Sequence, residues 1–208
     1  MKKRIFITAT NTNIGKTYAT SLLLKEFASQ GLRVGVFKPI ETGVENIPLD
    51  GKKLFDLACS LNPELRCLSL KTIVPYQFKL PAAPLVAKKE HKINIEFLEH
   101  KLQEIEKYCD IVLIEGAGGL LVPVEEELFM VDFISIFKTS VLLVCPSRLG
   151  SINDTLLSRY LLEDKKIPYA WAINLFEDKD TFAEVSAPFY HDDFLTLQDN
   201  IKEIANKL

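Results

Sequence analysis

The chain has 208 residues, of which 48% are hydrophobic and 25% are charged, and its formal net charge is −3. This composition is typical of a soluble globular protein, and the length fits one domain that spans residues 1–208. A mildly acidic chain without a long basic run has no electrostatic reason to bind nucleic acid or an anionic membrane.

Membrane and secreted classes are also excluded. No apolar run approaches the ~20 residues that would span a bilayer, and Ile5-Phe6-Ile7 is too short for the apolar core of a signal peptide. The four cysteines form no Cys-x-x-Cys pair, so we expect reduced thiols that mostly serve packing. The three histidines are scattered, which argues against a zinc site. We therefore expect a cytoplasmic protein.

Strand and helix signals alternate along the chain. Near-continuous apolar runs predict strands at residues 4–8, 33–37, 111–114, 141–145 and 169–174. Apolar residues at helical spacing predict helices at residues 17–30, 51–61, 95–108 and 152–165, and from about residue 197 to the last residue. This order predicts a single-domain α/β fold, with a doubly wound, mainly parallel sheet and helices on both faces. Ligands bind beyond the carboxyl ends of the strands in such sheets, so the residues after each strand should carry the chemistry.

The first predicted strand leads into a phosphate-binding loop. Gly15-Lys16-Thr17 stands between that strand and the first helix, the context that the motif requires. Backbone N–H groups would hold phosphate oxygens, Lys16 would reach the β- and γ-phosphates, and the Thr17 hydroxyl would bind Mg²⁺. Thr10 replaces the usual leading glycine, and a loop one residue longer fits if Ala9 keeps a negative φ. The loop indicates the P-loop NTPase fold.

Two charged residues follow other predicted strands. Lys38 comes directly after the second strand, where its charge would stabilise phosphoryl transfer near the γ-phosphate. Glu115 ends the third strand, where phosphate-loop NTPases commonly place a carboxylate directed at the metal. The small residues Gly116-Ala117-Gly118-Gly119 after it let the backbone approach a ligand and donate N–H groups. These segments predict a convergent site with the phosphate loop.

Two helix starts offer further candidates. Asp56 lies inside the helix predicted at residues 51–61, while Asp50 is the better placed to cap that helix, and either could complete a Mg²⁺ site. Gly150-Ser151-Ile152-Asn153 opens a later helix. Ser151 or Asn153 is either an N-cap alone or part of a helix N-terminus that binds a carboxylate, and the two roles are compatible.

Together these segments resemble the dethiobiotin synthetase family of the biotin pathway. The resemblance covers roughly residues 4–174 and rests on five segments in the family's order and spacing, at residues 6–17, 38–43, 75–84, 115–120 and 148–153. It implies a homodimer with the substrate site at its interface, and an ATP- and Mg²⁺-dependent ring closure. In that reaction 7,8-diaminopelargonic acid takes up CO₂, supplied by bicarbonate, as a carbamate. ATP then phosphorylates the carbamate, and the second amine closes the ring and expels phosphate.

The resemblance also implies a role for each matching residue. Lys38 and Lys16 would be catalytic, stabilising charge on the transferring phosphoryl group and on the carbamate. Mg²⁺ would be held by Thr17, Asp56 and Glu115. ATP would be bound by Asn13, Ile14, Gly15, Lys16, Thr17, Tyr18, Asp56, Glu115, Gly116, Ala117, Gly118 and Asn174. The diamine, its carbamate and its carboxylate would be bound by Thr12, Thr42, Gly119, Leu149, Gly150, Ser151, Ile152 and Asn153.

The end of the fifth predicted strand departs from the family pattern. Asn174 matches a base-reading asparagine, but the aspartate that often follows is Leu175 here, and no Gly-x-Ile-Pro segment closes over the base. The sequence therefore carries no signal for base selectivity or for a role of the residues after Asn174. ATP is the default nucleotide.

A regulatory ATPase of the partition type is the alternative function, because it shares the phosphate loop. That class carries a signature lysine where Asn11 stands, together with a basic surface or a membrane-targeting tail. Asn11 and the acidic chain favour the synthetase.

Overall fold

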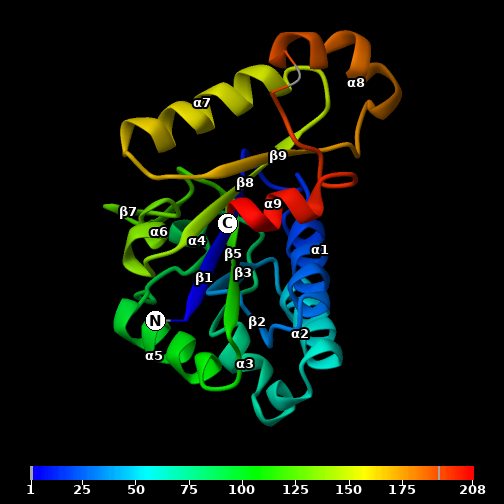
Figure 1. Cartoon of the computed structure of the whole chain (residues 1–208). Helices are drawn as coiled ribbons and strands as arrows, with labels where there is room; N and C mark the ends of the chain where they lie inside the picture. Colours follow the sequence, from blue (N-terminus) through cyan, green and yellow to red (C-terminus); the bar gives the residue numbers. More distant parts are fainter. Residues whose placement is uncertain (1, 192) are drawn as a thin grey trace.

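The fold is built on a parallel sheet at the centre of the molecule (Figure 1), seen in a computed structural model that describes residues 2–191 and 193–208. The strand order is β2-β5-β1-β8-β9, and every neighbouring pair is parallel. The strands are β1 (Lys3–Ala9), β2 (Val34–Phe37), β5 (Ile111–Gly119), β8 (Ser140–Pro146) and β9 (Ala170–Asn174). Each begins within one residue of its predicted start, so the predicted α/β fold is confirmed.

β1 lies in the middle of this sheet. Ile5 pairs with Leu113 of β5 on one side and with Ser140 of β8 on the other. Ile5, Phe6 and Ile7 are fully buried, as expected for a strand that is covered on both faces. The register then shifts between Ile7 and Ala9, where β1 approaches the phosphate loop.

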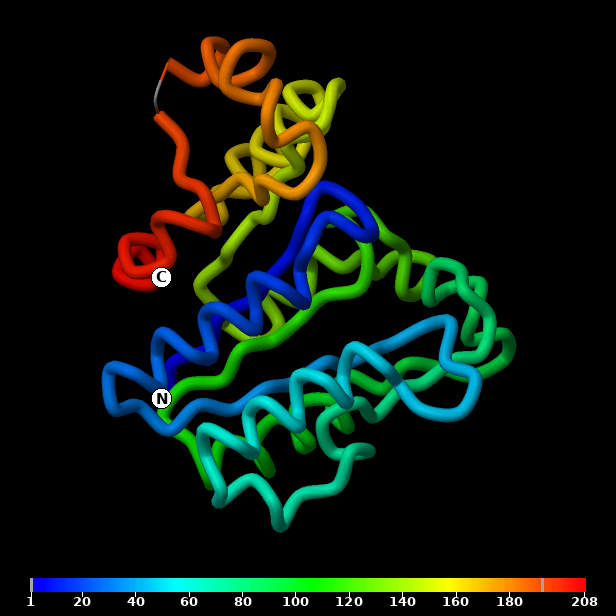
Figure 2. The backbone as a smooth tube through the Cα atoms, turned by 90° about the vertical axis from the view of Figure 1, so that its right-hand side faces the viewer, coloured from blue at the N-terminus to red at the C-terminus, as the bar shows by residue number. Residues whose placement is uncertain are grey.

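Helices cover both faces of the sheet. Figure 1 shows α1 (Lys16–Ser29), α2 (Leu49–Leu61) and α9 (Ile201–Lys207) on one side, and α5 (Ile95–Glu106), α6 (Asp132–Ile136) and α7 (Ser151–Asp164) on the other. Figure 2, seen from the side of α1, shows α9 next to that helix, and the two are in contact. This two-sided cover explains why the strands read as continuous apolar runs.

Shorter elements complete the fold. β3 (Ile40–Thr42) pairs in parallel with β4 (Tyr76–Phe78), and β6 (Pro123–Glu125) pairs antiparallel with β7 (Leu128–Phe129). The short helices are η1 (Pro63–Cys67), α3 (Leu70–Ile73), α4 (Pro84–Ala87), α8 (Lys179–Val185) and η2 (Ala187–Tyr190). β3 follows β2 almost at once, which keeps Thr42 close to the carboxyl end of that strand.

Two predicted boundaries are wrong near the ends of strands and helices. The third strand was predicted at residues 111–114, but β5 continues through the small residues after Glu115, because Gly119 still pairs with Ala9 of β1. α2 begins earlier than predicted, with Pro48 as its N-cap, so Asp50 lies in the first turn and does not cap the helix.

The last helix also begins later than predicted, at Ile201, because the residues before it extend the sheet. The N–H of Ile173 donates to the carbonyl of Leu195 (2.7 Å), and the N–H of Leu197 donates to the carbonyl of Ile173 (2.9 Å). Thr196 thereby forms a parallel bridge with Ile173. Because the bridge is parallel, residues 195–197 run alongside β9 toward the carboxyl ends of the strands.

All four cysteines are free thiols in the structure. Cys109 and Cys145 are fully buried, and burial raises the pKa of each thiol to about 12. Cys67 is exposed and Cys59 is half-buried. In the part of the chain that the structure describes, no helix is long and apolar enough to cross a membrane.

Candidate active site

A cavity of about 810 Å³ opens at the carboxyl ends of β1, β2 and β5. Most of the predicted site residues line it: Thr12, Asn13, Gly15, Lys16, Thr17, Tyr18, Lys38, Thr42, Glu115, Gly116, Ala117, Gly118 and Asn174. The lining also includes Ile40, Glu41, Asp50, Phe176 and Gln198. Segments far apart in the sequence thus converge where a parallel sheet binds its ligands.

The phosphate loop has the backbone that its sequence allows. Gly15 has a φ of 105° and Asn13 a φ of 61°, and glycine and asparagine are the residues that best tolerate such angles. Ala9 stays in β1 without a positive φ, which is the condition for the longer loop. α1 begins at Lys16, so the unpaired N–H groups of its first turn face the loop. The loop and the helix N-terminus thus have the geometry of sites that bind anions.

Lys16 is almost buried at the base of the cavity. Its Nζ donates to the carbonyl oxygen of Asn11 at 3.0 Å, across the phosphate loop. Burial and the nearby charge of Lys38 lower the pKa of Lys16 to about 8. An anion bound between the two lysines would offset their repulsion.

Glu115 is the centre of a network that joins β5, α1 and Lys38, the residue after β2. Lys38 Nζ lies 2.6 Å from Glu115 Oε1, and the hydroxyl of Thr17 donates to the same oxygen at 3.1 Å. The hydroxyl of Thr20, a residue that the sequence did not single out, lies 2.9 Å from Oε2. Burial acts to lower the pKa of Lys38, but the charge and hydrogen bond of Glu115 outweigh it and raise that pKa. Lys38 is therefore held as a cation beside the phosphate loop.

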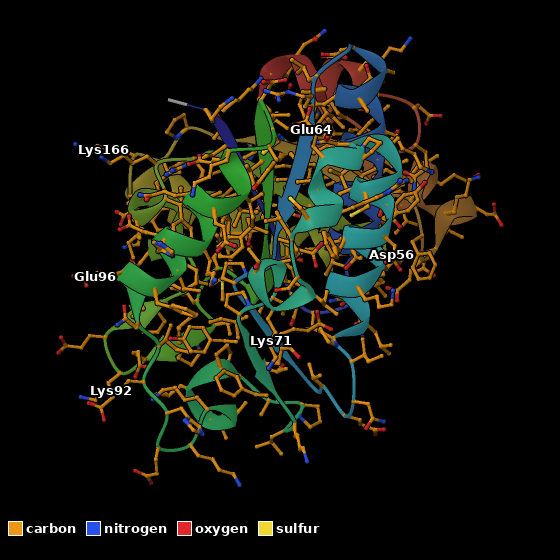
Figure 3. The ribbon with its side chains drawn as sticks, turned by 90° about the horizontal axis from the view of Figure 1, so that it is seen from below. Asp56, Glu64, Lys71, Lys92, Glu96 and Lys166 are labelled. Atoms are coloured by element: carbon orange, nitrogen blue, oxygen red, sulfur yellow. The ribbon has the colours of Figure 1, made fainter. Side chains whose placement is uncertain are left out.

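The second carboxylate of the predicted metal site lies elsewhere. Asp56, labelled on α2 in Figure 3, is exposed at the surface and forms an ion pair with Lys52 at 2.7 Å. Asp50 lines the cavity instead. The two residues are six apart, or about 1.7 helical turns, so they face different directions. Glu41 fixes this end of α2, because its carboxylate accepts the N–H of Asp50 (3.1 Å) and of Gly51 (2.8 Å).

The segment expected to bind a carboxylate is not part of this cavity. α7 begins at Ser151 with Gly150 as its N-cap, so the side chains of Ser151 and Asn153 do not cap the helix. Leu149 is 77% exposed. Gly119 lines a separate cavity of about 320 Å³, which it shares with residues of α7. Within one chain, residues 149–153 and Gly119 thus do not line the cavity that holds the two lysines.

The other end of the cavity is lined by Asn174, which the sequence predicted, and by Phe176 and Gln198, which it did not. Asn174 Nδ2 donates to the carbonyl oxygen of Ile14 (2.9 Å), and its Oδ1 accepts from Nε2 of Gln198 (2.8 Å). Ile14 belongs to the phosphate loop, and its side chain is buried. Phe176 carries no motif, and Gln198 reaches the cavity through the pairing of residues 195–197 beside β9, for which no sequence signal existed.

The oxygen groups in the cavity fit a magnesium ion. Thr17, Asp50 and Glu115 line one cavity and offer the hard oxygen ligands that Mg²⁺ takes. Among residues 2–191 and 193–208, no three His, Cys, Asp or Glu side chains are grouped so that they could hold a metal by themselves. A metal bound here would therefore depend on the hydroxyl and on phosphate oxygens of a nucleotide.

Solved structures with a similar chain path share the fold. A plasmid partition protein from Borrelia burgdorferi superposes with a TM-score of 0.56 at 13% identity, covering 99% of this chain and 96% of that one. The cell division protein MinD of Aquifex aeolicus gives a TM-score of 0.53 at 17% identity, covering 99% of this chain and 86% of that one. At such identities the likeness extends to the fold alone.

Similarity in sequence reaches further. A family model described as an AAA domain matches residues 3–188. The chain is 49% identical over 186 residues to the ATP-dependent dethiobiotin synthetase BioD of Sulfurovum sp. (strain NBC37-1), covering 89% of both chains. It is 40% identical over 191 residues to the protein of the same name from Wolinella succinogenes, covering 90% of this chain and 88% of that one. The chain therefore belongs to the ATP-dependent dethiobiotin synthetase family.

Proposed function

We propose that this chain is an ATP-dependent ligase that closes the ring of dethiobiotin in biotin synthesis, and that the 810 Å³ cavity is its active site. Lys16, Thr17, Lys38 and Glu115 meet in that cavity at the end of a phosphate loop, and this is the observation that carries the proposal. Its substrates are 7,8-diaminopelargonic acid, CO₂ and ATP, and its proposed location is the cytoplasm. Membership in the family decides against the partition-type switch considered from the sequence.

The two lysines act on charge that builds up between the reactants. One amine of the substrate takes up CO₂ as a carbamate, and a carbamate oxygen then attacks the γ-phosphorus and displaces ADP. Both partners are anions, so their approach needs cations that are already in place. Lys16 lines the cavity at the phosphate loop, and Lys38 lines it at the end of β2. The second amine then attacks the carbamoyl carbon, and phosphate leaves.

The metal site in this proposal uses Asp50 in place of Asp56. Thr17, Asp50 and Glu115 would hold Mg²⁺ together with phosphate oxygens. When bound, the metal supplies further positive charge at the transferring phosphoryl group. Glu115 also orients Lys38 through the 2.6 Å contact, so one carboxylate positions both a side chain and the metal.

The substrate side of the site requires a second copy of the chain. Thr12 and Thr42 line the cavity and would contact the diamine and its carbamate. Gly119 and residues 149–153 lie outside it, so we propose that a partner subunit supplies residues 149–153 to bind the substrate carboxylate. The exposed apolar side chains of α7 and the segment before it, Leu149, Leu157 and Tyr160, suit such an interface.

The test is phosphate release from ATP by the purified protein, with and without 7,8-diaminopelargonic acid, bicarbonate and Mg²⁺. We expect release only when all components are present, with dethiobiotin formed in equal amount. Release that ignores the diamine would instead support a regulatory ATPase.

Mixing two inactive variants tests the shared site. Lys38→Met removes a group from the cavity, and Asn153→Leu alters the segment assigned to the partner. Mixed dimers should regain partial activity, because one of their two sites has both parts intact. If mixing restores nothing while both variants remain dimeric, the site lies within a single chain.

A further inference from the structure

A chain of hydrogen bonds with a fixed direction lies at the end of the cavity away from Lys38. The N–H of Leu175 donates to Gln198 Oε1 at 3.2 Å, and Gln198 Nε2 donates to Asn174 Oδ1 at 2.8 Å. Asn174 Nδ2 then donates to the carbonyl of Ile14 at 2.9 Å. A backbone donor begins the chain and a backbone acceptor ends it. Neither amide side chain can therefore flip without breaking two hydrogen bonds.

This orientation leaves each amide with one donor and one acceptor to offer. An amide nitrogen carries two N–H groups and an amide oxygen two lone pairs, and the chain uses one of each. Asn174 and Gln198 both line the cavity, so the remaining groups are available to a ligand. Space near the loop is tight as well, because a Cβ on Gly15 would lie 2.2 Å from Asn174 Nδ2. Asn174 therefore has little freedom to turn.

The free groups match one purine better than the other. The outer edge of adenine offers the N7 acceptor beside the N6 amino donor, and an amide side chain pairs with both. Guanine offers N7 beside the O6 acceptor, so the amide oxygen would face O6 without a proton between them. Leu175 stands where the family often has an aspartate, so the position next to Asn174 offers no carboxylate to receive the N1 and N2 protons of guanine.

We propose that Gln198 is a specificity-determining residue of the nucleotide site, because it holds the Asn174 amide in the one orientation that pairs with adenine and opposes guanine. This rests on the proposed function, in which the triphosphate occupies the phosphate loop. Phe176 lines the same end of the cavity and is 75% exposed. Its ring offers a stacking surface that accepts any base, so discrimination falls to the two amides.

The experiment measures the affinity of the Mg²⁺ complexes of non-hydrolysable ATP and GTP analogues, and of tripolyphosphate, by calorimetry. We expect the wild-type protein to prefer the ATP analogue. Gln198→Leu should lower the ratio of the two affinities about fivefold, the effect of one lost hydrogen bond, and leave tripolyphosphate binding unchanged. Gln198→Glu should lower the ratio further, since a carboxylate can accept from Leu175 but cannot donate to Asn174.

Two control variants accompany these. Gln103→Leu makes the same change at an exposed position of α5, on the other face of the sheet, and should alter nothing. Phe176→Ala should weaken both analogues alike and keep their ratio.

Three results would overturn the proposal: equal wild-type affinity for the two analogues, an unchanged ratio in both Gln198 variants, or an equal loss for ATP, GTP and tripolyphosphate. The last would mean that Gln198 only supports the loop. The proposed function is judged separately by turnover with the diamine, so an enzyme that fails there still gives a ratio of affinities.

Discussion

Replacing Lys38 by methionine would separate what this residue does for the fold from what it does for the reaction. Methionine keeps most of the volume of lysine but removes the charge. Lys38 Nζ lies 2.6 Å from Glu115 Oε1, and the two side chains are only 5% and 0% exposed. The variant leaves a carboxylate in the interior without its cation.

The cost can be worked out from this geometry. Removing one partner of a buried ion pair destabilises a protein by about 3–5 kcal/mol. Glu115 keeps the hydroxyls of Thr17 and Thr20 at 3.1 and 2.9 Å, so we expect the lower end of that range. For a chain of this size, about 3 kcal/mol corresponds to a fall of about 6–12 °C in Tm. Loss of one preorganised charge at the transferring group should also lower kcat about 100-fold to 1,000-fold.

Thermal unfolding followed by circular dichroism, together with the phosphate-release assay, checks both effects. The double variant Lys38→Met/Glu115→Gln removes the stranded charge, so its Tm should return to within a few degrees of the wild-type value while its activity stays low. Recovery of stability without activity would show that the loss of rate is not a consequence of the loss of stability. A single variant that melts like the wild type, or that keeps most of its rate, would refute the reasoning.

Three further predictions concern the metal site, the phosphate loop and the buried thiols. Asp50→Asn should raise the Mg²⁺ concentration needed for half-maximal activity, whereas Asp56→Asn, outside the cavity, should not; the opposite result would restore the original assignment. Gly15→Ala and Gly31→Ala both introduce a side chain at positive φ, which should lower the free energy of unfolding by about 1–2 kcal/mol. Only the Gly15 variant also collides with Asn174, so only that variant should weaken ATP binding in calorimetry. Urea midpoints should fall as pH rises from about 9 toward about 12, because the two buried cysteines ionise near 9 when unfolded but near 12 when folded. A midpoint that is flat over that range would show that these thiols titrate alike in both states.

The fold could be predicted from the sequence because its strands have a local signature. Ile5, Phe6 and Ile7 form one of several apolar runs that are too continuous for a half-exposed sheet. Apolar residues at helical spacing lie between these runs, and together they predict the alternation of strands and helices. The phosphate loop, Lys38 and Glu115 could be placed together, because parallel strands bring their carboxyl ends to one edge.

The remaining parts of the site depend on contacts that no local pattern encodes. Asp50 and Asp56 are both exposed, but only Asp50 lines the cavity. Its place depends on the start of α2, where the distant carboxylate of Glu41 accepts the N–H groups of Asp50 and Gly51. Gln198 reaches the cavity through backbone pairing beside β9, in which the hydrogen bonds use no side chain and so leave no trace in the sequence.

The central position of β1 has a consequence for how the protein is made. Its neighbours in the sheet begin at Ile111 and Ser140, so β1 leaves the ribosome long before either strand that pairs with it. During that time Ile5, Phe6 and Ile7 remain an exposed apolar segment, which is the kind of segment that chaperones bind. Pairing at such long separation also slows folding. Because the phosphate loop follows this strand directly, ATP can stabilise the protein only after β1 has paired, and it cannot guide the folding that comes before.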